Sequence, residues 1–82
     1  MNSTAKKFAS EELSIRDLKV RKGTLCATIS DGRTISIPTS WFPGLENASL
    51  RDLENFEISP SGYGIHWPTL DEDISIKSFI DP

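Results

Sequence analysis

Five side chains in this sequence could do chemistry, and four of them lie close together. His66 is the sole histidine, and Asp71, Glu72 and Asp73 follow it within a few residues. A histidine next to carboxylates can bind a metal ion or take part in proton transfer. The fifth side chain is that of Cys26, the sole cysteine, which would be the nucleophile of a thiol enzyme. A metal site and a catalytic centre are therefore the two chemistries to consider first.

The residues around His66 do not favour a metal site. No second histidine exists, and no cysteine lies at ligand spacing. The run Asp71-Glu72-Asp73 lacks the ligand spacing and the central glycine of a calcium loop. Three adjacent acids also cannot all point one way without an irregular turn. We expect no metal ion and no cofactor, and we interpret His66 as a hydrogen-bond partner that orients one of the three acids.

Catalysis finds even less support in the sequence. Cys26 has no histidine at a spacing that would define a catalytic pair. Gly62 and Gly64 are not followed by a helix or a lysine, so they do not form a phosphate-binding loop. A domain of this size rarely holds a deep pocket as well. We predict that the protein is not an enzyme and has no catalytic residue.

Size and composition predict one small folded domain. The chain has 82 residues, of which 37% are hydrophobic and 26% charged, and this balance is typical of globular proteins. No apolar run approaches the roughly 20 residues that span a membrane, and residues 1–12 lack the apolar core of a secretory signal. A single cysteine suits a reducing compartment. We predict a cytoplasmic domain over residues 14–82 after a flexible segment, residues 1–13.

The first half of that domain shows clear strand signals. Apolar and polar residues alternate over about 15–21, 24–30 and 33–37. Lys22-Gly23 separates the first two segments, and Asp31-Gly32 separates the next two. Asp-Gly is a strong hairpin signal, because a type I′ turn needs positive φ at both central residues. These segments predict a three-stranded antiparallel meander with one aliphatic and one polar face.

Short helices and further strands are predicted after Pro38. Trp41, Phe42 and Leu45 lie on a first short helix, which must begin late enough to place Pro43 in its first turn. Ser49 opens a second helix over about 49–55. Strands are expected at 57–59 and 64–67, and 73–76 is either a last strand or the start of a terminal turn. The predicted fold is α+β: an antiparallel sheet of four to five strands with the two short helices packed on one face.

The aromatic side chains that follow Pro38 are expected in the core. Tryptophan and phenylalanine bury large apolar areas, and a buried indole N–H needs one hydrogen-bond partner. Trp67 precedes Pro68 at a strand end, which makes it the candidate for partial exposure at an interface. The residues assigned to the core on this basis are Trp41, Phe42, Phe56 and Trp67.

Several segments resemble a known family. They are Asp31-Gly32-Arg33, Ile35-x-Ile37-Pro38, Ser40-Trp41-Phe42-Pro43-x-Leu45 and Gly62-Tyr63-Gly64-Ile65-His66-Trp67-Pro68-x-Leu70-Asp71-Glu72-Asp73-Ile74-Ser75. Together they resemble the small bacterial family called domain of unknown function 2442, over about residues 15–80.

That resemblance implies a compact α+β fold and no assigned function. Many short members of the family are encoded beside another small protein, which implies a toxin–antitoxin-like gene pair. Two departures stand out: Ser49-Leu50 occupies a position where relatives often place proline after the cap, and the helix-turn-helix extension of some longer members is not expected here.

Charge is divided unevenly along the chain. Residues 1–41 hold seven basic and four acidic side chains, and residues 42–82 hold two basic and eight acidic. We expect a non-enzymatic protein-interaction module whose acidic C-terminal half meets a basic partner, such as the product of an adjacent gene. The candidate interaction residues are His66, Trp67, Asp71, Glu72 and Asp73.

Other functions remain open at this point. The alternative is a small-ligand or metal-binding domain that uses His66 and the turn Asp71–Asp73. Direct nucleic-acid binding is less favoured, since it would need a basic stripe on the polar sheet face formed by Arg16, Lys19, Arg21, Lys22 and Arg33. A homodimer through a sheet edge or the polar face is a further option.

Overall fold

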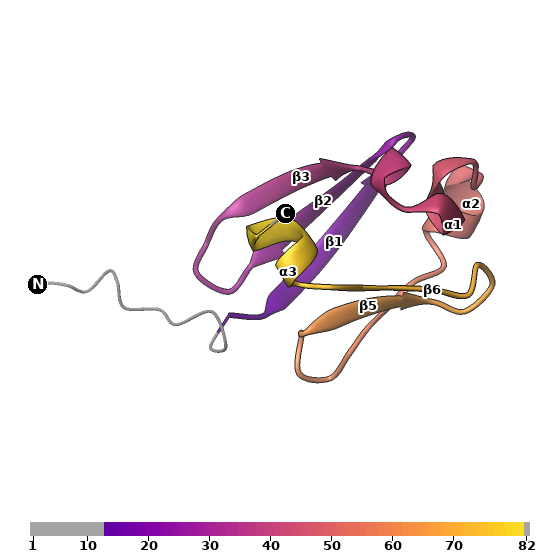
Figure 1. The fold of residues 1–82 in the computed structure, drawn as a ribbon. Helices are drawn as coiled ribbons and strands as arrows, with labels where there is room; N and C mark the ends of the chain where they lie inside the picture. Colours follow the sequence, from indigo (N-terminus) through magenta and orange to yellow (C-terminus); the bar gives the residue numbers. More distant parts are fainter. Residues whose placement is uncertain (1–12, 82) are drawn as a thin grey trace, which may run out of the picture.

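The described part of the chain forms two antiparallel sheets that face each other across one core. The computed structural model describes residues 13–81. Sheet A contains β1 (Ile15–Arg21), β2 (Thr24–Ile29) and β3 (Thr34–Pro38) in the order β1-β2-β3. Sheet B contains β4 (Glu57–Ile58), β5 (Gly64–Trp67) and β6 (Glu72–Ser75) in the order β4-β5-β6. Figure 1 shows sheet B as a separate layer beside sheet A.

This arrangement corrects the predicted single sheet of four to five strands. The strands were expected at the right places, but β4 pairs with β5 and not with an edge of sheet A. Both residues of β4, Glu57 and Ile58, pair with β5 across a short connection. Stacking two sheets face to face also covers the aliphatic side of each, whereas one extended sheet would leave that side exposed.

Sheet A forms as the alternation predicts. Leu25, Ala27 and Ile29 of β2 point into the core, and the residues between them point outward. The β2–β3 hairpin is present, but its turn is not type I′, because Gly32 has a positive φ of 98° and Asp31 does not. The Gly32 N–H binds the Ile29 carbonyl, and the Ile29 N–H binds the Arg33 carbonyl. The turn therefore has three residues and ends on glycine, which is a common alternative for hairpins.

Between residues 13 and 81, four single helical turns connect and close the two sheets. They are η3 (Thr39–Trp41), α1 (Pro43–Glu46), α2 (Leu50–Leu53) and α3 (Lys77–Ile80). Pro43 begins α1, as expected, and the Asp52 N–H donates to the Ser49 Oγ at 3.1 Å to cap α2. Turns this short are not stable alone, so packing of a buried residue in each one holds it in place. Within residues 13–81, no helix has the length and apolar content needed to cross a membrane.

The core lies between the sheets and contains residues from nearly every element. Trp67 has no exposed surface, and its indole N–H donates to the Leu53 carbonyl at 2.8 Å. The ring of Phe56 packs beside it, with 6.4 Å between ring centroids. The buried apolar residues are Leu13, Ile15, Leu18, Leu25, Ala27, Ile29, Ile37, Leu45, Leu53, Ile65, Trp67, Ile74, Ile76 and Phe79.

Trp41 and Leu13 differ in burial from what the sequence predicted. Trp41 was expected in the core, but 51% of its surface is exposed. It lies in the single turn η3, where Thr39 is the buried residue, and a turn of three residues buries only one side. Leu13 is part of the core, although it was assigned to the flexible segment. Residues 1–12 of that segment lie outside the described residues.

Candidate functional site

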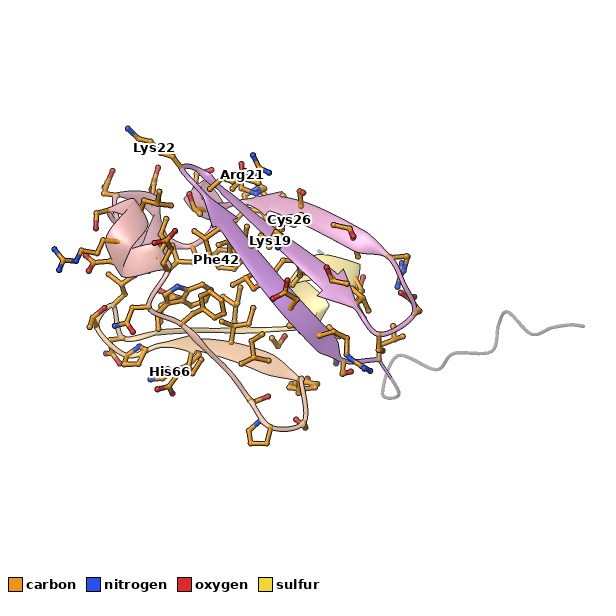
Figure 2. All side chains as sticks on the ribbon, turned by 180° about the vertical axis from the view of Figure 1, so that it is seen from behind. Lys19, Arg21, Lys22, Cys26, Phe42 and His66 are labelled. Carbon is orange, nitrogen blue, oxygen red and sulfur yellow. The ribbon has the colours of Figure 1, made fainter. Side chains whose placement is uncertain are left out.

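His66 and Asp73 face each other on neighbouring strands of sheet B. They are register partners in the β5–β6 hairpin. Ile65 and Trp67 point into the core, so alternation places His66 on the outer face. The His66 Nδ1 lies 2.6 Å from the Asp73 Oδ1. The predicted hydrogen bond between His66 and one of the acids is therefore present, and Figure 2 shows the imidazole directed away from the core.

The three candidate acids Asp71, Glu72 and Asp73 do not share one face of sheet B. Asp73 lies on the outer face, with 76% of its side chain exposed. Glu72 is the register partner of Trp67, so it points the other way and lies against Gly44 of α1. Asp71 occupies the turn before β6 with a positive φ of 51°. Alternation along β6 separates Glu72 from Asp73, and only Asp73 is paired with His66.

A second carboxylate joins the pair from the other side. Glu57 is the register partner of His66 on β4, so His66 is flanked by Glu57 and Asp73 across the three strands of sheet B. Glu57, His66 and Asp73 all line an open hollow of about 890 Å³. We call these three residues the acidic triplet. It places one imidazole and two carboxylates on three neighbouring strands of sheet B.

The loop before β5 closes one end of the same hollow. The Ser59 Oγ accepts hydrogen bonds from the Tyr63 N–H at 3.0 Å and from the Gly64 N–H at 3.2 Å. These bonds hold the loop in a defined shape. Tyr63 leaves the loop with 51% of its surface exposed and lines the hollow beside the acidic triplet. The hollow thus offers an aromatic contact next to two carboxylates, a combination that suits recognition of a basic, partly apolar surface.

Gly62 anchors this loop to sheet A. Its carbonyl accepts the Ile15 N–H at 2.7 Å, which is a direct backbone bond between the loop and β1. Gly62 has a positive φ of 75°, and a Cβ placed there would lie 2.6 Å from the Cβ of Ser14. The close approach requires glycine on both counts. The position of Tyr63, and of the hollow it borders, therefore depends on Gly62.

One predicted interaction residue is wrong. Trp67 is fully buried, so it cannot contact a partner. Its side chain connects β5 to the end of α2, and its contribution is to the fold. Glu57 and Tyr63 were missed as surface residues. Glu57 could have been found by pairing the predicted strand at 57–59 with the one at 64–67, because that register places it opposite His66.

The described residues provide little for metal or thiol chemistry. Residues 13–81 contain no cluster of three or more histidine, cysteine, aspartate or glutamate side chains arranged to hold a metal ion. Cys26 points outward from β2 and is half-buried on the outer face of sheet A. Figure 2 shows Cys26 and His66 on opposite sides of the molecule. They cannot act together.

The basic side chains of sheet A do not form one stripe. Lys19, Arg21 and Lys22 follow β1 to its turn (Figure 2). Arg33 lies in the β2–β3 turn at the other end of the sheet, where its Nε is 2.7 Å from the Asp31 Oδ2. The Arg33 backbone N–H also donates to Asp31, and these contacts hold the pKa of the Asp31 carboxyl below its ordinary value of 3.8. The charge of Arg33 is thus neutralised by Asp31, and Arg33 is separated from Lys19, Arg21 and Lys22.

Residues 13–81 form a small α+β domain with a polar, exposed face on the second of its two sheets. The chain belongs to the family described as "Protein of unknown function (DUF2442)", whose model matches residues 15–82. This confirms the family that the sequence motifs indicated. No curated protein matches the sequence.

Two solved structures share the fold. A protein of unknown function from Rhodospirillum rubrum is 32% identical, with a TM-score of 0.73 over 82% of this chain and 83% of that one. An uncharacterized protein from Chromobacterium violaceum is 26% identical, with a TM-score of 0.69. The latter match covers 83% of this chain and 64% of that protein.

Proposed function

We propose that this protein is a non-enzymatic protein-interaction module and that the acidic triplet is its recognition site. The partner would be a protein with a basic surface, such as the product of an adjacent gene in a toxin–antitoxin-like pair. The observation that carries the proposal is the pairing of His66 with Asp73 on an exposed sheet face, with Glu57 on the other side of His66. This replaces the wider patch of Asp71, Glu72 and Asp73.

Both the geometry of the acidic triplet and the charge of the surrounding chain support recognition of a partner. The hydrogen bond between the His66 Nδ1 and the Asp73 carboxylate restrains both side chains, so less conformational entropy is lost when a partner binds. Charge supports it as well, since residues 39–81 hold eight acidic and two basic side chains. A field of this sign attracts a basic protein and speeds its association at low salt.

Co-purification with the product of the adjacent gene tests this proposal. The variant carries Glu57→Gln and Asp73→Asn, which keep the shapes of both side chains and remove both charges. The matched control carries Glu46→Gln and Glu54→Gln on α1 and at the end of α2, with the same change in net charge. We expect the first variant to lose the partner and the control to retain it. Equal retention by both would contradict the proposal.

A small-ligand or metal site is the second candidate, favoured by the hollow that His66 and Asp73 line. A ligand that binds only the folded state raises the melting temperature. Divalent metals and nucleotides can be screened in this way, with His66→Ala as the control. A rise in the melting temperature that His66→Ala abolishes would support this candidate. No rise across the panel would favour the protein-interaction proposal.

A further inference from the structure

The outer edge of β6 carries backbone groups that the fold does not pair. β6 is the last strand of sheet B, and its one neighbour in the sheet is β5. The Ile76 N–H donates to the Tyr63 carbonyl at 2.7 Å, on the β5 side. Hydrogen-bonded and non-bonded positions alternate along an antiparallel pair, so Ile74 also bonds to β5, whereas the N–H and C=O of Asp73 and Ser75 point to the outer edge. In the described part of the chain, no backbone hydrogen bond reaches these groups.

The other strand edges of the two sheets are less available for pairing. β1 is already bonded to the loop before β5, through the Ile15 N–H and the Gly62 carbonyl. β3 contacts α3, and β4 has only two residues. Beside β6, two open hollows of about 890 and 750 Å³ share Phe42, Ser75 and Ser78 in their lining. Figure 1 shows α3 at the end of β6 and not along its length, so the edge at Ser75 remains open.

An open edge of this kind can take up one more strand. Main-chain hydrogen bonds supply the affinity of such a contact, and the side chains beside the edge select the partner. Successive side chains of an added strand lie on alternate faces. On the outer face they meet Asp73, which is 76% exposed and paired with His66. On the inner face they meet Phe42, which packs against the core.

The charges of β6 indicate which segment fits this edge. The strand contains Glu72 and Asp73 and no basic residue. Two copies of the chain paired edge to edge would place two such strands side by side, and like charges on neighbouring strands are destabilising. A lysine or arginine opposite Asp73 forms a cross-strand pair of opposite charge instead. A segment in which basic and apolar residues alternate therefore fits the edge better than a second copy.

We propose that an extended segment of the partner, with alternating basic and apolar residues, adds to β6 as a further antiparallel strand of sheet B. The basic residues pair through their backbone with Asp73 and Ser75, and their side chains lie on the outer face. The apolar residues between them face Phe42. This inference rests on the proposed function, since Asp73 belongs to the acidic triplet, and it adds the conformation and the sequence pattern of the bound segment.

Synthetic peptides test the backbone pairing without any change to the protein. The probe is a capped peptide in which lysine and valine alternate, and two further peptides carry N-methyl groups on every lysine or on every valine. In the proposed register the lysine N–H groups bond to β6 and the valine N–H groups point away. NMR titration of the full chain should give a dissociation constant below about 1 mM, with the largest amide shifts at Asp73 and Ser75.

The methylated peptides give the decisive comparison. Methylation of the lysines should weaken binding at least about tenfold, because it removes the N–H groups that bond to β6. Methylation of the valines should change binding less than about threefold. An alternating glutamate–valine peptide should not bind. No binding of the probe at about 1 mM, equal weakening by the two methylations, or equal binding of the glutamate peptide would overturn the proposal.

Ser75→Pro and Ser36→Pro form a matched pair on the protein. Each removes the N–H of an edge residue, because bonds from Ile29 to Arg33 and from Thr39 to Gly23 direct the Ser36 N–H away from β2. An edge position tolerates proline, and thermal melts show whether each variant is folded. Ser75→Pro should lose both the peptide and the adjacent gene product, whereas Ser36→Pro should bind both.

The same variants separate this inference from the proposed function. If Ser75→Pro retains the adjacent gene product and Glu57→Gln/Asp73→Asn loses it, the acidic triplet recognises the partner but strand addition is wrong. If Glu57→Gln/Asp73→Asn retains the gene product, the proposed function itself fails. Sedimentation of the wild type without peptide examines the remaining occupant. A dimer that Ser75→Pro dissociates would show that a second copy occupies the edge, and it would overturn the inference.

Discussion

The two sheets of this molecule are specified in different ways. Sheet A consists of strands of five to seven residues joined by short turns, and its alternation is legible in the sequence. Sheet B consists of strands of two to four residues. Residues 59–68, which include β5, contain two glycines and two prolines. The alternation of apolar and polar residues is enough to specify sheet A, whereas sheet B depends on contacts with the rest of the fold.

Charge follows the same division. Residues 13–38, which contain sheet A, hold five basic and two acidic side chains, and residues 39–81 hold two basic and eight acidic. The sheet that local sequence specifies least is also the one that carries the proposed recognition site. This is common in proteins, because a rigid scaffold can support a less regular region in which binding groups are placed. Substitutions in sheet A and in sheet B should therefore have different effects on stability.

The largest effect is expected at Trp67, which joins sheet B to α2. Trp67→Ala removes a fully buried side chain and leaves the Leu53 carbonyl without its donor. The free energy of unfolding should fall by about 3–5 kcal/mol. Trp41→Ala, at a half-exposed site, should cost less than about 1 kcal/mol. Chemical denaturation at low protein concentration measures both, and similar losses would contradict the assignment of one tryptophan to the core and the other to the surface.

Glycine substitutions should also separate the two regions. Gly62→Ala combines a positive φ with an overlap against Ser14, so it should cost about 3 kcal/mol or more. Gly32→Ala in the β2–β3 turn has a positive φ but no atom within 4 Å of the added methyl group. It should cost only about 1 kcal/mol. Urea titrations of the two variants make the comparison, and a larger loss at Gly32 would show that the loop–β1 contact matters little.

A smaller effect is expected at the cap of α2. Ser49→Ala removes the acceptor for the Asp52 N–H and should lower the free energy of unfolding by about 1 kcal/mol. Ser49→Asp restores an acceptor and should recover most of that loss. Thermal melts of the three proteins test this. If Ser49→Ala melts like the wild type, packing of Leu53 alone must hold the turn.

The smallest effect is expected at Asp31 in sheet A. The Arg33 N–H and guanidinium lower the pKa of Asp31 in the folded state. A lowered pKa stabilises the fold above the unfolded value and loses that contribution as the pH falls through the folded value. Stability should therefore fall more steeply below about pH 4 in the wild type than in Asp31→Asn. Acid titrations of both proteins, followed by circular dichroism, would reveal the difference. Identical unfolding curves below about pH 4 would contradict the prediction.

Much of the fold could be predicted from the sequence. The three strands of sheet A, the glycine turn at Gly32, the cap at Ser49 and the start of α1 at Pro43 all depend on neighbouring residues, and all are present. The division into two sheets could not be predicted. It depends on β4 staying unpaired with the edges of sheet A and on the hydrogen bond from the Ile15 N–H to the Gly62 carbonyl, and neither feature has a local signal.

The site was also predicted only in part, because some of its contacts depend on strand register and not on neighbouring residues. The alternation along the strand correctly placed His66 on the face opposite to that of Ile65 and Trp67. The expected hydrogen bond between His66 and an acid is present, and the acid is Asp73. The choice of Asp73 over Asp71 and Glu72 depends on the β5–β6 register, which the sequence did not define. Trp67 was correctly assigned to the core, but its use as an interaction candidate was wrong, because the side chain is fully buried and its indole N–H donates to the Leu53 carbonyl. The role of the acidic triplet in binding remains a prediction.

The central claim is that the acidic triplet recognises a basic protein, and a binding titration tests it most directly. Isothermal titration calorimetry of the adjacent gene product into the wild type, the Glu57→Gln/Asp73→Asn variant and the Glu46→Gln/Glu54→Gln control gives three dissociation constants. We predict that the first variant binds at least about a hundredfold more weakly than the wild type and that the control stays within about threefold. Equal weakening in both variants would show that only net charge matters. That result, or undiminished binding by the first variant, would contradict the account.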